Sequence, residues 1–515
     1  MLLAAAAGGV SVLAFAPFDF AYLPVVTLAV LFTLWHRASP REALRTGFAF
    51  GLGLFGAGTP WLYIALHTFG GMNAALAALG VTGFCCYLAL YPGFAGLLAT
   101  RWTAAGGVPR LLACASTWPL LEWVRSWPIV DFPWLSIGYA SLLPHGASWL
   151  AGFAPLGGVW LVSLAYASLA TVLAGLVHAL SIARWRPAIA GLVPGLLVIG
   201  GAALLQRVEW THPEGSTLTI SLVQGNVGQD VKFDPAQRDA TFALYRELAR
   251  ASRGRVVVLP ESAMPAFADE IPASVWREFL QVATERDGLL LTGLFTIEPP
   301  EPGAHGLRYY NSVVGLGAAE PQLYRKRHLV PFGESIPLEP IVGWFIRDVL
   351  SIPLANQSRG AVEQAAFGIA GQRIAVDICY EDVFGSDIRQ QARTATILVN
   401  VTNDAWYGRS VAAEQHNQIA AMRALEAGRP LLRATNTGIT SHIAPDGRVI
   451  ARLPWFAVGT LEASVQGYSG ATPFVRWGDA VAIVCAAMLL ALAIVVERLR
   501  ALRQRRNDVP AQHAR

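Results

Sequence analysis

The chain has 515 residues, of which 54% are apolar and only 14% are charged. Soluble domains carry about 25% charged residues, so a large part of this chain is expected to lie in lipid, and the composition excludes disordered, collagen-like and disulfide-scaffold proteins. The net charge of +4 is too small to indicate nucleic acid as a partner.

Apolar runs in the sequence predict eight membrane-spanning helices, seven of them before residue 207. The predicted spans cover residues 2–17, 20–35, 47–65, 75–99, 108–124, 150–180, 187–206 and 480–496. A cleaved signal peptide is not favoured, because the first basic residue is Arg37. The stretch 126–149 is rich in Pro and Trp, which indicates an interfacial or re-entrant segment rather than a span.

These spans divide the chain into a transmembrane domain over 1–206, a soluble domain over 207–475, and a final span with a basic tail over 476–515. With the N-terminus in the cytoplasm, the loops on that side carry groups of arginines, whereas the short outer loops hold only Arg125. Basic residues favour the cytoplasmic side of a membrane. Both termini are therefore predicted to be cytoplasmic and the soluble domain extracytoplasmic, although one misplaced span would invert that domain.

The soluble domain alternates strand-like and helix-like patterns, which predicts an α/β layered fold. Short β-branched or apolar runs predict strands over 217–223, 256–259, 289–295, 309–316, 374–378 and 397–401. Helical spacing predicts helices over 235–252, 273–286 and 411–427. Gly428 fits a C-terminal stop for the last helix.

Cys379 is the one cysteine of the soluble domain, and it follows directly after the predicted strand 374–378. The carboxyl end of a strand is a usual place for functional residues in α/β domains. An unpaired thiol in an oxidising compartment is a liability unless it is buried or useful. A small buried core residue is the alternative, so the neighbouring residues decide between the two.

Lysine is rare in this chain, and its two occurrences differ in their surroundings. Of the 39 Lys and Arg residues, only Lys232 and Lys326 are lysines, which leaves 37 arginines. Lys326 lies between two arginines, so a simple surface charge there would be Arg; a compact ammonium suits the stabilisation of an oxyanion instead. Lys232 is equally rare but lies in a polar loop with no evident partner, and Lys232→Arg is expected to be nearly neutral.

Glu261 completes a usable set of groups, because four apolar residues and a proline lead straight into this carboxylate. A solvated loop glutamate is the alternative. In the set, Glu261 would take the thiol proton, Lys326 would stabilise an oxyanion, and Cys379 would hold an acyl group as a thioester. No motif matches a phosphate loop, a zinc site or a Ser-His-Asp triad, so no metal or cofactor is expected. His328 and His416 are expected to be structural or surface residues.

Short motifs of the soluble domain carry a resemblance to a known enzyme superfamily. They are Leu-Val-Gln-Gly-Asn at 222–226, Pro-Glu-Ser at 260–262, Tyr-Tyr-Asn-Ser at 309–312, Tyr-Arg-Lys-Arg-His-Leu-Val-Pro-Phe-Gly-Glu at 324–334, Cys-Tyr-Glu at 379–381, Asn-Asp-Ala-Trp at 403–406 and Met-Arg-Ala-Leu-Glu-Ala-Gly-Arg-Pro at 422–430. The domain resembles the nitrilase, or carbon–nitrogen hydrolase, superfamily. The whole chain, with its eight-span layout, is similar to one membrane branch, the apolipoprotein N-acyltransferase family. That resemblance implies an α-β-β-α sandwich for residues 207–475.

The same resemblance implies roles for the matching residues. Glu261 matches the general base, Lys326 the oxyanion stabiliser and Cys379 the nucleophile of the family's Glu-Lys-Cys set. Glu334 matches an additional active-site carboxylate, which helps to position the lysine and the reacting groups.

Four further positions are implied to contact the substrate or to support the nucleophile. Tyr380 and Glu381 match the essential neighbours of the nucleophile, and Trp406 matches an aromatic residue that lines the acyl-chain path. At Phe233 the family usually has Trp, so Phe keeps an aromatic wall but loses the indole N–H.

The implied activity moves a fatty acyl chain from a membrane phospholipid to the α-amino group of the N-terminal diacylglyceryl-cysteine of an apolipoprotein, through a thioester and with ping-pong behaviour. The implied location is a bacterial inner membrane, with the catalytic domain in the periplasm. One alternative is a membrane-tethered nitrilase-type amidase that hydrolyses a soluble amide. A transporter or channel would need paired ionisable residues deep in the spans, and the sequence has almost none.

Residues 341–354 form an apolar segment close after Glu334, with prolines on both sides and with Trp344 beside Phe345. An ordinary buried helix is one interpretation. A mobile lid or interfacial loop over the lipid entrance is the other, favoured by the prolines and by the adjacent aromatic residues. Trp344 and Phe345 are accordingly predicted to contact the lipid substrate.

Overall fold

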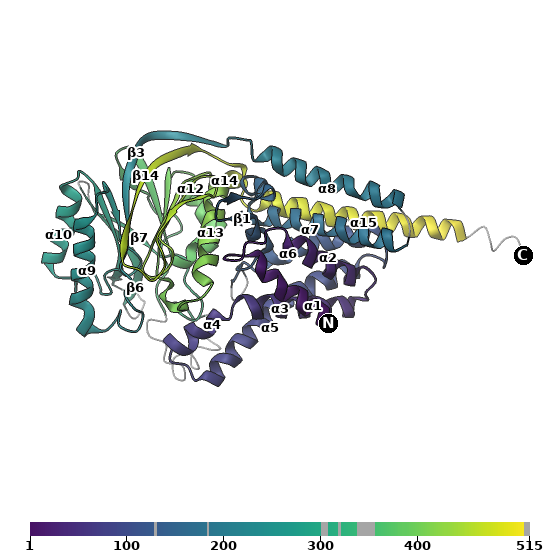
Figure 1. Ribbon diagram of the computed structural model, residues 1–515, viewed down its shortest axis with the longest axis horizontal. Coiled ribbons are helices and arrows are strands. Elements are labelled where there is room, and N and C mark those ends of the chain that lie inside the picture. The colour runs from purple at the N-terminus through teal and green to yellow at the C-terminus, as the bar shows by residue number, and fades with distance from the viewer. Residues whose placement is uncertain (128–130, 183–184, 300–306, 318–320, 337–355, 509–515) are drawn as a thin grey trace, which may run out of the picture.

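The computed structural model describes residues 1–127, 131–182, 185–299, 307–317, 321–336 and 356–508. A bundle of helices occupies one end of the elongated molecule, and two β-sheets with their flanking helices occupy the other (Figure 1). The N-terminus lies within the helical end.

The helical end is built from the first part of the chain together with the last helix. Its helices are α1 (Leu2–Ser11), α2 (Leu23–His36), α3 (Pro40–Gly58), α4 (Trp61–Tyr63), α5 (Ala74–Arg101), α6 (Val108–Val124), α7 (Ala154–Ser181), α8 (Trp185–Leu205) and α15 (Ala480–Asp508), with the short turns η1 (Val12–Ala14) and η2 (Ile64–Phe69). A helix therefore occupies each of the eight predicted apolar runs.

Helix length decides which of these elements could cross a membrane unaided. In the described part of the chain, three helices are long and apolar enough: Ala74–Arg101, Trp149–Ser181 and Ala480–Arg505. Pro40–Gly58 and Trp61–Phe69 qualify as a pair but are bent by 58° at the break between them. The predicted run 47–65 is thus divided just before Pro60, where a helix is disfavoured. The count of eight spans stays a prediction.

Two six-stranded sheets form the other end, in the orders β13-β12-β11-β10-β9-β8 and β14-β3-β4-β5-β6-β7. The strands are β3 (Thr211–Gln224), β4 (Val256–Val258), β5 (Leu289–Glu298), β6 (Arg308–Gly317), β7 (Gln322–Arg325), β8 (Phe367–Ile369), β9 (Gln372–Ile378), β10 (Ile397–Thr402), β11 (Leu431–Thr435), β12 (Ser441–Ile443), β13 (Val449–Arg452) and β14 (Gly459–Gly470). Parallel pairing joins β3 to β4 and β4 to β5, and likewise β9 to β10 and β10 to β11. The six predicted strands are confirmed.

The two sheets pack face to face between two layers of helices. Apolar side chains such as Ile220 and Val258 from one sheet, and Val376 from the other, form a single buried core between them. The flanking helices are α9 (Arg238–Ala251), α10 (Ala273–Thr284), α12 (Gly385–Ala392) and α13 (Ala412–Ala427). Phe242 on α9 and Phe279 on α10 cover the outer face of the sheet that contains β3, β4 and β5. Helices α12 and α13 cover the other sheet and lie on the side of the helical bundle (Figure 1). The predicted α-β-β-α sandwich is confirmed.

Residues 131–153 lie where the helical and sheet ends meet, and they belong largely to the stretch predicted to be interfacial. They form η3 (Ile137–Ser141), the hairpin β1 (Leu142–Leu143) and β2 (Gly146–Ala147), and η4 (Trp149–Phe153). Trp134 is buried, and its indole N–H donates to Gln415 Oε1 on α13 at 2.7 Å. The Tyr380 hydroxyl donates to the main-chain carbonyl of Asp131 at 2.6 Å. This segment therefore connects the bundle to the turn that follows β9.

A second connection between the two ends lies at the start of α7. Gly158 has a φ of +69°, and a Cβ there would approach the Phe474 ring to 2.6 Å, so only glycine fits. The next residue, Val159, donates its main-chain N–H to Glu426 Oε1 on α13 at 2.7 Å. The non-helical backbone at Gly158 bends the start of α7 and allows this helix of the bundle to pack against α13 of the sandwich.

Candidate active site

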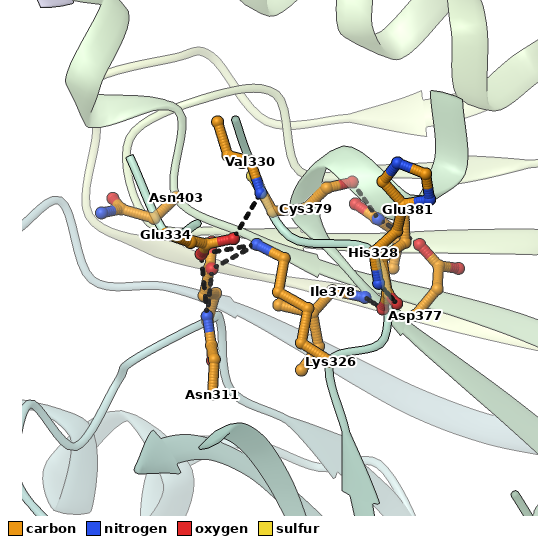
Figure 2. Close-up of polar contacts among 12 residues, drawn as sticks. Asn311, Lys326, His328, Val330, Glu334, Asp377, Ile378, Cys379, Glu381 and Asn403 are labelled. Atoms are coloured by element: carbon orange, nitrogen blue, oxygen red, sulfur yellow. Dashed lines mark hydrogen bonds and ion pairs between the residues drawn. The ribbon is translucent and has the colours of Figure 1, made fainter. Parts of the chain in front are cut away.

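The three residues predicted to form a catalytic set follow three strand ends. Glu261 comes shortly after β4, Lys326 directly after β7, and Cys379 directly after β9, where it opens the 3₁₀ turn η7 (Cys379–Val383). Since β4 and β7 belong to one sheet and β9 to the other, the set forms only when the two sheets pack together. Figure 2 shows Lys326 and Cys379 at this shared edge, close to Glu334.

Lys326 is held by two carboxylates in a buried position. Its ammonium donates to Glu334 Oε1 at 2.8 Å and to Glu261 Oε1 at 3.4 Å, and its side chain is only 1% exposed. Burial alone would lower the pKa of Lys326, but Glu334 and Glu261 outweigh it and raise the pKa well above its ordinary value. The lysine therefore stays an ammonium.

Asn311 on β6 joins the same two carboxylates, although the sequence prediction gave it no role. Its Nδ2 donates to Glu261 Oε1 at 2.7 Å and to Glu334 Oε1 at 3.5 Å. The main-chain N–H of Lys326 donates to the Asn311 carbonyl at 2.8 Å. A polar residue inside the motif at 309–312 was the available signal for this position.

Cys379 adopts an uncommon backbone conformation, with a φ of +54°. Asn400 Nδ2 donates to its main-chain carbonyl at 3.1 Å, which helps to hold the turn. Burial and the negative charge of Glu261 raise the pKa of the Cys379 thiol well above its ordinary value, although Lys326 opposes them. The resting thiol therefore keeps its proton and needs a base before it can attack. A thiol, a carboxylate and an ammonium in this arrangement suit acyl transfer through a thioester.

Glu381 is buried, and its carboxylate ties two loops of the site together. One oxygen accepts the main-chain N–H groups of Arg327 at 2.8 Å and His328 at 3.0 Å. The other accepts the main-chain N–H of Ile378 at 2.8 Å and the hydroxyl of Tyr324 at 2.9 Å. The residues after Lys326 and the residue before Cys379 thus share one anchor.

Lys232 has a partner that the sequence did not reveal, and it is buried. The residue is 1% exposed, and its ammonium donates to the main-chain carbonyl of Glu261 at 3.0 Å. Burial lowers the pKa of Lys232 to about 8, while Glu261 and Cys379 oppose that shift. The scarcity of lysine, which singled out Lys326, applied to Lys232 as well.

A buried polar cluster that the sequence prediction missed supports the turn after Cys379. His416 on α13 contacts Asp382 Oδ1 through Nε2 and Asp404 Oδ1 through Nδ1, each at 2.8 Å. Arg433 on β11 donates to Asp382 Oδ2 at 2.6 Å. His416 was expected to be either a structural or a surface residue. Its contacts and its burial show that it is structural.

His328 is also a partly buried structural residue rather than a surface one. Its Nε2 lies 2.5 Å from Asp131 Oδ2, and its ring stacks on Phe384 with centroids 3.5 Å apart. The expectation of a structural role fits these contacts.

Two aromatic residues predicted to contact the substrate are partly exposed, whereas Glu261, Lys326 and Cys379 are buried. Phe233 and Trp406 are 41% and 39% exposed, and their rings lie near Phe295 at 6.2 Å and Phe69 at 6.4 Å respectively. Trp344 and Phe345 lie outside the described residues, so their contact with lipid stays a prediction.

A groove at the opposite end of the strands is separate from this site. A groove of about 530 Å³ is lined by Gly288, Gly371 and Gln372, among others; it lies where β5 and β9 begin, whereas Cys379 follows the other end of β9. Among the described residues, no group of three or more His, Cys, Asp or Glu side chains could hold a metal ion.

Comparison with known proteins matches both ends of the molecule. Residues 7–172 match the family model of the apolipoprotein N-acyltransferase N-terminal domain, and residues 219–474 match that of carbon–nitrogen hydrolase. A solved amidase of the nitrilase superfamily from Nesterenkonia AN1 aligns with 51% of this chain and 95% of its own, at 16% identity and a TM-score of 0.35.

Curated proteins are similar along nearly the full length. The apolipoprotein N-acyltransferase of Nitrosomonas europaea is 44% identical over 494 residues, which cover 95% of this chain and 96% of that protein. The proteins of the same name from Methylococcus capsulatus and Ralstonia nicotianae are 41% and 42% identical. The alignment with the Methylococcus protein covers 95% of both chains. The alignment with the Ralstonia protein covers 97% of this chain and 94% of that protein.

Proposed function

Because the chain belongs to the apolipoprotein N-acyltransferase family, we propose that it moves a fatty acyl chain from a membrane phospholipid to the α-amino group of the N-terminal diacylglyceryl-cysteine of an apolipoprotein. The observation that carries the proposal is the buried contact of Lys326 with both Glu261 and Glu334 at the sheet edge where Cys379 lies. Full-length similarity, helical end included, favours this activity over a tethered amidase.

In the first half-reaction, Glu261 takes the proton of the Cys379 thiol, and the thiolate attacks the ester carbonyl of the phospholipid. The Lys326 ammonium stabilises the oxyanion that develops on the carbonyl oxygen. The intermediate collapses when the C–O bond breaks, and the leaving alkoxide takes the proton from Glu261. A lysophospholipid departs, and the acyl group remains on sulfur as a thioester.

In the second half-reaction, the α-amino group of the apolipoprotein attacks the thioester carbonyl and gives a proton to Glu261. Lys326 again stabilises the oxyanion. The C–S bond breaks, an amide is formed, and the Cys379 thiolate recovers the proton from Glu261. Glu334 keeps Lys326 in place, while Tyr380 and Glu381 hold the nucleophile turn; Phe233 and Trp406 line the path of the acyl chain.

The same proposal includes a place in the membrane. The helical end, which includes α15, would form eight spans in a bacterial inner membrane. Both termini would be cytoplasmic, and the sandwich over 207–475 would lie in the periplasm. The one-sided distribution of loop arginines supports this orientation. Reporter fusions at Gly106 and after Arg448 would test it: a periplasmic signal at Gly106 or a cytoplasmic signal at Arg448 would refute the orientation.

Mass spectrometry of the intact enzyme after incubation with phospholipid alone tests the chemistry directly. We expect a mass increase of one acyl group on the peptide that contains Cys379, and its loss when a diacylglyceryl lipopeptide is added. Cys379→Ala should carry no acyl group while keeping its fold. An amidase would instead leave the lipopeptide amine unmodified and release free fatty acid or ammonia.

A further inference from the structure

The only two lysines of the chain meet at one residue. Lys326 contacts the Glu261 carboxylate from one side at 3.4 Å, and Lys232 donates to the Glu261 main-chain carbonyl at 3.0 Å. The chain otherwise uses arginine for its basic residues, 37 times in all. Two lysines that are far apart in sequence therefore converge on the residue assigned as the base, one on its carboxylate and one on its main-chain carbonyl.

Lys232 is costly as a purely structural residue. Burying an ammonium is unfavourable unless it is paired and hydrogen-bonded, and in the described chain its one hydrogen bond goes to a neutral carbonyl. Where a buried cation only bridges carbonyls in this chain, the residue is an arginine: Arg429 donates to the carbonyls of Ala395 at 2.8 Å and Gly470 at 2.7 Å. The ionisable side chains that interact electrostatically with Lys232 are instead Glu261 and Cys379.

Extending the proposed acyl transfer, we propose that Lys232 is a positioning residue: it fixes the backbone at Glu261 and holds a second positive charge within electrostatic range of Cys379. The inference rests on the proposed function, since it assigns Lys232 to the machinery that generates the thiolate.

The backbone at Glu261 needs such a fixed point. The next residue, Ser262, has a φ of +47°, a conformation that is uncommon for residues other than glycine. The carbonyl that Lys232 holds belongs to the peptide unit joining Glu261 to Ser262. Lys232 therefore secures the strained turn from which the Glu261 carboxylate reaches Lys326.

The charge balance of the site gives Lys232 a second task. Glu261 and Glu334 carry two negative charges, which Lys326 and Lys232 balance with two positive ones. Asp404 also acts on Cys379, but it is paired with His416 and Arg433. When Glu261 takes the proton of Cys379, the thiolate replaces the carboxylate and the balance is kept. Without Lys232, the buried site would carry one unbalanced negative charge, which disfavours the thiolate.

Three variants at this position separate the hydrogen bond from the charge. Lys232→Met removes both, Lys232→Gln keeps an N–H donor without charge, and Lys232→Arg keeps the charge on a larger group. Arg429→Met is the matched control, since it removes a buried cation that touches no group of the site. For each variant we would measure thioester formation on Cys379, the pH dependence of its alkylation by iodoacetamide at the Cys379 peptide, and the melting temperature.

We expect Lys232→Met to slow thioester formation at least 10-fold and to move the alkylation profile to higher pH. Lys232→Gln should show the same shift of the alkylation profile to higher pH. Lys232→Arg keeps the positive charge, so its profile should lie closer to that of the wild type. Arg429→Met should lower the melting temperature and leave the profile unchanged.

A folded Lys232→Met or Lys232→Gln enzyme with the wild-type thioester rate and alkylation profile would overturn the inference. So would an equal shift of the profile in Arg429→Met, because the effect would then reflect general loosening of the fold. If Lys232→Met does not fold, Lys232→Gln decides alone. A wild-type enzyme that forms no thioester would defeat the proposed function itself, whereas a wild-type thioester with an unaffected Lys232 series defeats only this inference.

Discussion

Glu381 accepts the main-chain N–H of Ile378 at 2.8 Å, and Ile378 is the residue immediately before Cys379. The same carboxylate accepts the main-chain N–H groups of Arg327 and His328, which follow Lys326 directly (Figure 2). One side chain thus sets the distance between the nucleophile turn and the lysine loop, which come from different sheets. We therefore propose that Glu381 acts on the reaction by holding these two loops, without contact with the substrate.

Glu381→Gln tests this role. An amide offers one acceptor oxygen where the carboxylate offers two, so its NH₂ group would face main-chain N–H donors or the Tyr324 hydroxyl. Each buried donor left unpaired costs about 1–3 kcal/mol. We expect thioester formation to fall at least 10-fold and the melting temperature to drop, as measured on the purified enzyme in detergent. A variant with wild-type values of both quantities would contradict the role assigned to Glu381.

Lys326→Arg tests whether the site needs an ammonium or merely a positive charge. A guanidinium is larger and planar, and the 1% exposure of the Lys326 side chain leaves no room for it beside Glu261 and Glu334. We expect a loss of about 100-fold or more in the rate of thioester formation, comparable to removing one oxyanion donor.

Arg325→Lys is the matched control for that change, because Arg325 is the adjacent residue and pairs with Glu298 away from Cys379. Its side chain is 23% exposed, so we expect the rate to change less than 2-fold, the effect of a solvent-screened ion pair. Similar losses in both variants would mean that the loop, rather than the ammonium, is sensitive.

The fold and the central set were predictable because their signals are local in sequence. β-Branched runs and helical spacing identified the strands and helices of the sandwich. Strand ends together with the rarity of lysine singled out Glu261, Lys326 and Cys379, which the structure places at one sheet edge. Lys232 was misjudged because its partner is a main-chain carbonyl 29 positions away. A loop that becomes buried only through tertiary packing carries no periodic pattern that would reveal its burial.

The cluster around His416 was missed for the same reason. Its partners Asp382 and Asp404 lie 34 and 12 positions away, and three ionisable groups that are buried together look in sequence like three ordinary polar residues. Likewise, the bend in the run 47–65 came from a single proline within an otherwise continuous apolar pattern.

His416 predicts how the stability of the sandwich depends on pH. Burial and Arg433 oppose its charged form, but Asp382 and Asp404 outweigh them and raise the pKa of His416 to about 9, from an ordinary value of 6.5. Since the folded-state pKa is the higher one, the stabilisation is fully present below pH 6.5 and is lost as the pH rises through 9. Its full size is about 3 kcal/mol.

The measurement compares melting temperatures of the wild type and His416→Gln at several pH values. We expect a large gap at pH 6 that narrows between pH 6.5 and 9 and is nearly constant above that range. A gap that is independent of pH would show that folding does not shift the pKa of His416, and it would contradict the prediction.

Trp406 offers a test of the acyl-chain path that is separate from the buried set. It belongs to the turn η8 (Asp404–Tyr407), next to the short helices α4 and η2 of the helical end. The Trp406 ring lies 6.4 Å from the Phe69 ring on η2, and the Tyr407 ring lies 4.6 Å from the Trp61 ring on α4. Trp406 thus lies between the sheet edge that carries Cys379 and a helix of the predicted membrane domain, where an acyl chain would pass.

We expect Trp406→Ala to slow thioester formation from long-chain phospholipids about 10-fold and to affect short-chain donors much less, because the lost apolar contact grows with chain length, by about 0.8 kcal/mol per buried CH₂. At 39% exposure the side chain contributes little to the core, so the melting temperature should stay nearly unchanged. Trp477→Ala is the control, since this tryptophan is 58% exposed on α14 (Pro473–Trp477) and lies away from the turn. A lower melting temperature, or equal losses for short and long donors, would show that Trp406 supports the fold rather than the substrate.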